Sequence, residues 1–186
     1  MLLGLSALLC LGQAPTPLAN ATLYIVRHAE KPADGTGLTP AGEARAKAYV
    51  RYFRKDPVDG STLHFSHLFA AKDSKKSFRP RLTLEPLAKA VGQKLDLRFT
   101  DKEPEPFVQE LRAKPYGDRI LVGWRHGGIP ALLSALGVDP KKFVPEGKWP
   151  DEVYDRVIEL RFDGKGQCDV AKSRMVQEHL MPGDAK

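Results

Sequence analysis

The chain has few of the features that would crosslink it or hold it in a bilayer. Only two cysteines occur in 186 residues. Cys10 lies in the apolar segment at the start of the chain, so removal of that segment leaves Cys168 alone and excludes an intramolecular disulfide. No uncharged apolar run reaches the roughly 20 residues that span a membrane as a helix. At this length, with 42% hydrophobic residues, we expect one domain with its own core.

Long basic runs are missing too, although the net charge is +6. Such a charge favours anionic partners in general. However, no basic run is longer than the pair Lys75-Lys76, and no aromatic platforms stand beside the basic residues. We therefore expect a solvated basic surface and no nucleic-acid partner.

Charge is absent from the first part of the chain, where Arg27 is the first charged side chain. The apolar run Leu2–Gly12 has the length of a signal-peptide core and is too short to span a bilayer. Ala19-Asn20-Ala21 offers a small-x-small cleavage site. We therefore expect residues 1–21 to be a signal peptide and residues 22–186 to form the domain. The protein would be exported (periplasmic or extracellular), with no stable membrane association after processing; the alternative is a buried N-terminal element.

The rest of the chain alternates short apolar runs with amphipathic stretches, which is typical of βα units. Strands are predicted at 23–26, 68–71, 95–99 and 119–123, and helices at 39–54, 83–91, 105–113 and 129–136. Two further extended segments, 153–162 and 168–177, flank a hairpin sequence at 163–166. The expected fold class is three-layer α/β/α with a mostly parallel sheet.

Two predicted strands end close to a histidine. The first leads into Arg27-His28-Ala29, and the strand 119–123 leads into Trp124-Arg125-His126. Carboxyl ends of parallel strands open onto one edge of a sheet, where ligands bind. A histidine buried in a core explains either residue alone but not the repeated arrangement. We therefore predict that His28 and His126 face one small anionic group.

Basic residues also follow the second predicted strand, at Arg79 and Arg81, and would lie on the same edge. By itself this fragment would be a solvated basic turn. Each of the three fragments is a weak signal alone, and only their combination is specific.

Together the fragments resemble the histidine phosphatase superfamily, which is phosphoglycerate-mutase-like in fold. The resemblance runs from Leu23 to about Gly137. Its matching motifs are Arg27-His28-Ala29, Leu38-Thr39-Pro40-Ala41-Gly42, Arg79 with Thr83 four residues later, and the strand–His motif at His126. The segment Trp124–Pro130 is similar to a less characterised branch with a Trp-x-His-Gly-x-Ile-Pro sequence.

The resemblance implies a phosphomonoester hydrolase that needs no metal and no cofactor. His28 would attack phosphorus and form a phosphohistidine, which water then hydrolyses. Arg27 and Arg79 would clamp the phosphate, and His126 would add a further donor. The expected partner is a small phosphorylated substrate. The histidines also lack the spacing of metal ligands.

Several points stay open at this level. The insert before Arg79 is longer than the family's usual link, so Arg81 competes with Arg79 for the phosphate. The general acid is Glu103, Glu105 or Glu30. A catalytically weak protein that binds a phosphorylated ligand and a phosphoglycerate-type mutase are the alternatives to a hydrolase. No motif identifies the substrate or the oligomeric state.

Overall fold

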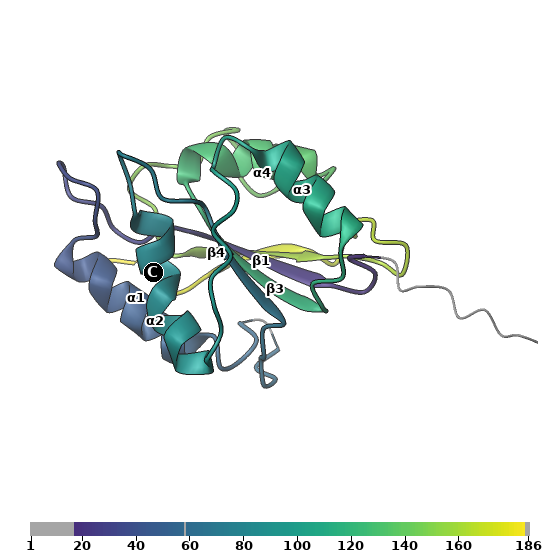
Figure 1. Cartoon of the computed structure of the whole chain (residues 1–186), viewed down its shortest axis with the longest axis horizontal. Coiled ribbons are helices and arrows are strands. Elements are labelled where there is room, and N and C mark those ends of the chain that lie inside the picture. Colours follow the sequence, from purple (N-terminus) through teal and green to yellow (C-terminus); the bar gives the residue numbers. More distant parts are fainter. Residues whose placement is uncertain (1–16, 58, 185–186) are drawn as a thin grey trace, which may run out of the picture.

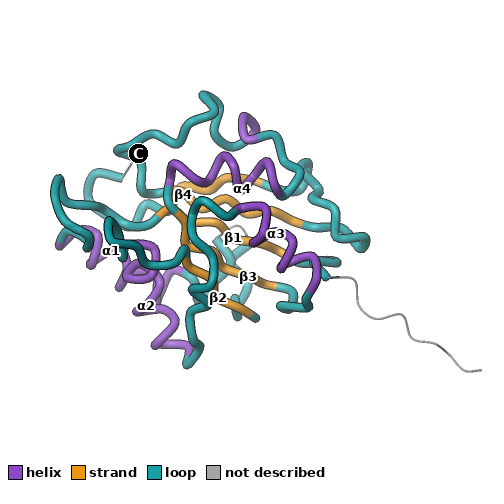
Figure 2. Tube along the Cα trace, turned by 45° about the horizontal axis from the view of Figure 1, so that its top comes forward, coloured by secondary structure: helices purple, strands orange, loops and turns teal. Residues whose placement is uncertain are grey.

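Five strands form one sheet in the order β2-β3-β1-β4-β5 in the computed structural model, which describes residues 17–57 and 59–184 (Figure 2). β1 pairs in parallel with β3, and β3 with β2, whereas β4 is antiparallel to both of its neighbours. Every strand except β4 therefore runs in the same direction. The strands are β1 Thr22–Arg27, β2 His67–Ala70, β3 Arg119–Trp124, β4 Arg156–Arg161 and β5 Arg174–Gln177.

Helices cover both faces of this sheet (Figure 1). They are α1 Pro40–Tyr52, α2 Arg79–Val91, α3 Pro104–Ala113 and α4 Ile129–Ala135, with short 3₁₀ turns at His126–Gly128 and Pro140–Lys142. Helices α1 and α2 lie on one face, and α3 and α4 lie on the other. The expected three-layer α/β/α architecture is confirmed.

The core follows the two-residue alternation of β1. Tyr24 and Val26 pack with α1 and α2, whereas Leu23 and Ile25 pack with α3 and α4. A strand buried on both faces reads as a continuous apolar run, which is how this one was predicted. It carries the chain through the middle of the sheet and delivers the residues after it to the sheet's edge.

The start of α1 is held against the backbone that follows β1. The Thr39 side chain accepts a hydrogen bond from the Gly42 N–H at 3.1 Å, and the Thr39 N–H donates to the Glu30 carbonyl at 3.0 Å. A Cβ at Gly42 would lie 2.6 Å from that same carbonyl oxygen. The Leu38–Gly42 motif therefore lets the helix approach the chain closely just after His28.

Two predicted elements differ in the structure. Helix α2 begins at Arg79, not at residue 83, because Pro80 is tolerated in the first turn of a helix. The predicted strand 95–99 is wrong: apart from one bridge between Phe69 and Asp96, this extended segment is not a strand. Arg98 turns back onto the Asp96 carboxylate at 2.6 Å, so the segment follows the edge of β2 without extending the ladder.

The C-terminal hairpin is shorter than predicted but has the expected form. β4 and β5 are antiparallel, and a further bridge joins Phe162 to Cys168 beside the turn.

The described chain begins with a turn that packs on the domain. Leu18 and Ala21 are buried in the core, and the Asn20 N–H donates to the Asp163 carbonyl at 2.9 Å. Residues 1–16 of the predicted signal peptide lie outside the described residues. The expected boundary between residues 21 and 22 thus falls within a segment that contacts the core. In the described part of the chain, no helix has the length and apolar character needed to cross a membrane.

Candidate active site

The two strand-end histidines lie side by side. His28 follows β1 directly, and its N–H donates to the Trp124 carbonyl at the end of β3 at 2.9 Å. Because β1 and β3 are adjacent and parallel, His126 emerges at the same edge, with its ring centre 5.8 Å from that of His28. The structure therefore brings together two residues that are far apart in sequence, as predicted.

The hydrogen bonding of His28 determines which nitrogen can react. Its Nδ1 lies 2.7 Å from the Ala29 carbonyl oxygen, which can only accept, so Nδ1 carries the hydrogen and Nε2 keeps its lone pair. Burial lowers the pKa of His28 to about 3, against the opposing effect of the Ala29 hydrogen bond, and the charge of Arg27 adds to the lowering. The imidazole is thus neutral at neutral pH, as a nucleophile must be.

Arg27 is fully buried beside His28 and is held from one side only. Its Nη1 donates to the carbonyls of Pro150, Asp151 and Val153 at 3.0, 2.7 and 2.9 Å, and its guanidinium carbon lies 3.8 Å from the centre of the Tyr154 ring. Nε and Nη2 of Arg27 are buried and have no hydrogen-bond partner among the described residues. Two such donors on one edge match two oxygens of a tetrahedral oxyanion.

The structure places Arg79 and Arg81 in different electrostatic settings. Arg81 contacts two carboxylates, Asp73 at 2.7 Å and Glu85 at 3.1 Å. Arg79 donates instead to backbone carbonyls, including that of Gly37 at 3.0 Å, and its charge is close enough to lower the pKa of His28. Arg79 therefore keeps an unneutralised charge near the nucleophile, and Arg81 does not.

The four-residue spacing from Arg79 to Thr83 has a structural reason. The Thr83 hydroxyl accepts from the Ala29 N–H at 2.8 Å and donates to the Arg79 carbonyl at 2.7 Å. One buried side chain thus joins the first turn of α2 to the backbone after His28.

His126 is oriented by an acidic residue, Asp151, to which the sequence assigned no role in the site. Residues 148–154, here named the strap, run past the two histidines, and Asp151 Oδ1 lies 2.9 Å from His126 Nε2. His126 Nδ1 is buried and finds no partner within residues 17–57 and 59–184. Burial and the charge of Arg27 lower the pKa of His126, while Asp151 acts in the opposite direction.

Arg125 is a third cation at this edge that sequence reasoning missed. Its Nη1 lies 3.1 Å from Asp101 and its Nη2 donates to the Ser74 hydroxyl at 2.7 Å. After burial, the charge of Arg125 is the largest influence lowering the pKa of Arg79, so the two guanidinium groups are neighbours. The available signal in the sequence was an arginine directly before a strand-end histidine.

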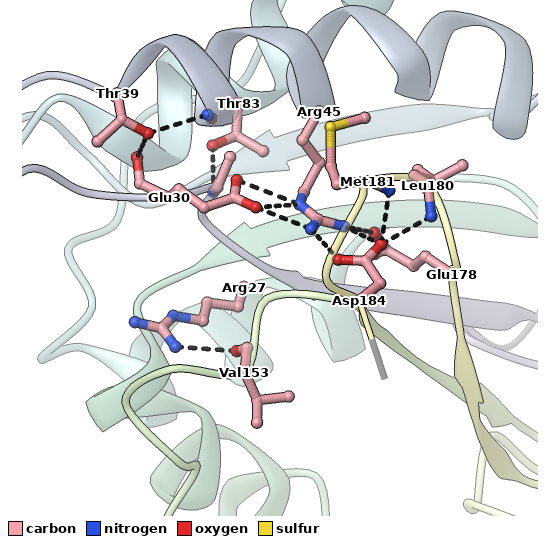
Figure 3. Close-up of polar contacts among 12 residues, drawn as sticks. Arg27, Glu30, Thr39, Arg45, Thr83, Val153, Glu178, Leu180, Met181 and Asp184 are labelled. Carbon is pink, nitrogen blue, oxygen red and sulfur yellow. Dashed lines mark hydrogen bonds and ion pairs between the residues drawn. The ribbon is translucent and has the colours of Figure 1, made fainter. Parts of the chain in front are cut away.

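The three predicted acids lie in other settings. The Glu30 carboxylate pairs with Arg45 at 2.8 Å (Figure 3). Glu103 accepts the N–H and the hydroxyl of Thr100, both at 2.8 Å, and the backbone hydrogen bond lowers its pKa. Glu105 is exposed in the first turn of α3. In the described residues, no three His, Cys, Asp or Glu side chains gather as a metal site.

A cleft of about 700 Å³ adjoins the nucleophile without including it. Part of its wall is shared with the site, through Glu30, Val153 and Tyr154. The rest comes from α1, from Glu152 and Asp155, and from residues 181–184.

The sequence matches no protein-family model and no curated protein, but the structure matches solved ones. A phosphoglycerate mutase from Bacillus anthracis aligns with a TM-score of 0.59 at 14% identity, covering 86% of this chain and 94% of that one. The SixA protein of Agrobacterium tumefaciens gives 0.55 at 15% identity, with 85% and 97% covered. A mycobacterial glucosyl-3-phosphoglycerate phosphatase gives 0.52 at 15% identity, also with 85% and 97% covered. The chain has the phosphoglycerate-mutase-like fold.

The solved neighbours are members of the histidine phosphatase superfamily. At such low identities the likeness concerns the fold alone. Within this phosphoglycerate-mutase-like fold, the chemistry of the present site follows from its own side chains. They place two Arg27 donors, which have no partner in the part of the chain that the structure describes, beside a neutral histidine.

Proposed function

We propose that the protein is a phosphomonoester hydrolase that works through a phosphohistidine on His28. The observation that carries the proposal is the surroundings of that residue. His28 is neutral and keeps a lone pair on Nε2, while Arg27 Nε and Nη2 and His126 Nδ1 are buried beside it without partners in the described structure. Buried polar groups without partners are costly in a folded protein unless a ligand uses them.

The reaction follows from these positions. His28 Nε2 attacks phosphorus as the bond to the leaving oxygen breaks, and water then displaces the phosphoryl group from nitrogen. Arg27 and Arg79 neutralise the non-bridging oxygens throughout. Because guanidinium groups supply this charge, the proposed reaction requires no metal.

The substrate is a small phosphorylated molecule in this proposal. Solved structures with this fold include a phosphoserine phosphatase from Entamoeba histolytica in complex with phosphoserine, as well as the mycobacterial phosphatase. Because another structure with this fold is a phosphoglycerate mutase from Bacillus anthracis, a mutase remains the alternative to a hydrolase. A hydrolase releases inorganic phosphate from its substrate, whereas a mutase returns the phosphoryl group to an isomer of it.

The test combines phosphate release with labelling of the protein. The wild type should hydrolyse an aryl phosphate in the presence of EDTA and, after reaction with a ³²P-labelled substrate, carry label that is stable in base and labile in acid. His28→Asn should lose both, with a rate loss of at least about 10⁴-fold. The exposed His64 provides the matched control, since His64→Asn should keep both. Label retained by folded His28→Asn would contradict the mechanism.

Export is a separate proposal that rests on the apolar run Leu2–Gly12. Burial of Leu18 and Ala21 supports cleavage upstream of Leu18 rather than after residue 21, because the later cut would remove two core side chains. Mass spectrometry of protein from the native host should find an N-terminus before Leu18, outside the cytoplasm. A cytosolic protein with an intact Met1 would contradict export and favour the mutase.

A further inference from the structure

The contact between His126 and Asp151 bears on where the leaving group obtains its proton. Cleavage of an alkyl phosphate needs a proton on the departing oxygen, an effect typically worth about 10²–10⁴ in rate. Glu30 and Glu103 are engaged by other groups, and Glu105 is exposed on α3. None of these three carboxylates is therefore placed to donate the proton, and the groups beside His28 are the next candidates.

His126 has the geometry of such a group. Asp151 Oδ1 lies 2.9 Å from Nε2, and an ionised carboxylate can only accept, so Nε2 carries a hydrogen and Nδ1 holds the lone pair. Nδ1 is the buried nitrogen, and the ring centre is 5.8 Å from that of His28. The backbone carbonyl of Asp151 also accepts a hydrogen bond from Arg27 Nη1 at 2.7 Å. One residue of the strap therefore orients both His126 and Arg27.

A lone pair on Nδ1 cannot hydrogen bond to an oxyanion, whereas an imidazolium N–H can. We infer that His126 and Asp151 are the proton-carrying pair of this site: His126 takes up a proton at Nδ1 when a tetrahedral dianion binds and delivers it to the leaving oxygen, with Asp151 as the positioning residue. This inference rests on the proposed function of the same site.

Bonds and protons balance in both half-reactions, the formation of the phosphohistidine and its hydrolysis. As His28 Nε2 forms its bond to phosphorus, the bond from phosphorus to the leaving oxygen breaks, and the proton on His126 Nδ1 moves to that oxygen to release the alcohol. Neutral His126 then accepts a proton from the attacking water at Nδ1. The phosphorus–nitrogen bond breaks, inorganic phosphate leaves, and His28 is neutral again.

The charges around His126 support proton uptake on binding. Burial and the charge of Arg27 lower the pKa of His126 in the free protein, and Lys31 adds to this, so the ring is neutral at pH 7. A bound dianion adds negative charge at the same place and raises that pKa. The titratable and charged groups that face or influence the ring are Arg27, His28, Lys31, Lys148 and Asp151.

Sulfate is a direct probe of this uptake, since it is a tetrahedral dianion that does not titrate near neutrality. Calorimetry of sulfate binding at pH 7, in buffers that differ in ionisation enthalpy, should show uptake approaching about one proton per sulfate in the wild type. His126→Asn should bind sulfate without uptake. Sulfate binding by the wild type with no proton uptake would overturn the inference.

Leaving groups of different basicity give the second measurement. His126→Asn should slow an alkyl phosphate about a hundredfold more than nitrophenyl phosphate, whose leaving group needs no proton. Asp151→Asn should move the alkaline limb of kcat to lower pH, because the His126 imidazolium loses its carboxylate partner, and Asp151→Glu should restore part of it. Asp118 lies at the opposite end of β3, so Asp118→Asn should leave the limb in place.

The two proposals can fail separately. If His28 becomes labelled but both variants slow alkyl and nitrophenyl phosphates equally, the proton-carrying pair is wrong and the hydrolase stands. If the wild type takes up a proton with sulfate but never forms the labelled intermediate, the phosphohistidine mechanism is wrong instead.

Discussion

Arg27 and Arg45 are both buried, with exposed fractions of 0% and 1%, and they differ in what surrounds them. Arg45 is enclosed by three carboxylates, Glu30 at 2.8 Å, Glu178 at 3.0 Å and Asp184, which tie α1 to the C-terminal segment (Figure 3). Arg27 forms no ion pair with a carboxylate among residues 17–57 and 59–184. Three carbonyls of the strap hold one of its nitrogens, and the other two are left without partners in the described residues.

The difference separates a structural arginine from one kept for a ligand. The donors of Arg45 are used by the protein, and its cluster even has an excess of negative charge. Burial raises the pKa of Glu178 to about 8, against the lowering effects of Arg45 and of the Tyr49 hydrogen bond. Arg27 is desolvated and oriented without being neutralised, which leaves its charge to an incoming anion. The folded protein bears a cost for this, since unpaired buried donors destabilise it.

The largest expected effects come from exchanging each arginine for methionine. Arg27→Met should lower kcat/KM for an aryl phosphate by about 10³-fold, because two donors to the transition state are lost, with little loss of thermal stability. Arg45→Met should destabilise the protein by about 3–5 kcal/mol, since it leaves buried carboxylates without their positively charged partner. The folded fraction should remain active. Urea unfolding and steady-state kinetics on both variants measure this. If Arg27→Met unfolds the protein and Arg45→Met only inactivates it, the assignment of Arg45 as structural and Arg27 as ligand-binding is wrong.

A smaller version of the same contrast exists on α2. Arg79→Ala should slow turnover about a hundredfold, because an unneutralised cation beside His28 is removed. Arg81→Ala loses only partly exposed ion pairs with Asp73 and Glu85, and should keep the rate within about twofold. Measuring kcat of both variants with the same aryl phosphate tests this difference. A large loss of rate in Arg81→Ala and a small loss in Arg79→Ala would show that Arg81, not Arg79, contacts the phosphate.

The sequence predicted the parts of this site that depend on local pattern. The apolar run before Arg27 and the Thr39-Pro40 start of α1 are short-range features, and a parallel sheet necessarily brings the ends of β1 and β3 together. The extended segment 95–99 was misjudged, because apolar alternation does not reveal whether a partner strand continues the ladder.

The rest of the site depends on contacts between distant residues. Asp151 reaches His126 from the strap, whose sequence reads as an ordinary loop. Arg45 looks like any solvent-facing residue of an amphipathic helix until Glu178 and Asp184 arrive from the other end of the chain. For the same reason the sequence could not show that Glu30, two residues after His28, is paired with Arg45.

His28 should leave a pH-dependent mark on stability. Its pKa is depressed in the folded state to about 3 and is about 6.5 when unfolded, so between these values the unfolded chain binds the extra proton. Stability is therefore lost as pH falls below 6.5, by about 1.4 kcal/mol per pH unit at most. Relative to His28→Asn, the wild type should lose about 2 kcal/mol between pH 7 and pH 5, measured by urea unfolding. Parallel curves for the two proteins would show that the imidazole is not held neutral.

The smallest expected effect is at Glu103, where the comparison extends from arginines to carboxylates. Its oxygen accepts both donors of Thr100, and its pKa is lowered by the backbone hydrogen bond, so the group is ionised and has no proton to give. Glu103→Gln should therefore leave the ratio of kcat for alkyl and nitrophenyl phosphates within about twofold of the wild type. Glu30→Gln should instead weaken the Arg45 cluster and lower stability, again without changing that ratio, because its carboxylate is bound to Arg45. A selective loss of alkyl phosphate hydrolysis in folded Glu103→Gln would return the general acid to the loop before α3 and contradict the assignment to His126. If the loss occurred in Glu30→Gln, a carboxylate would serve both the structural cluster and the chemistry, and the separation between Arg45 and Arg27 would no longer hold.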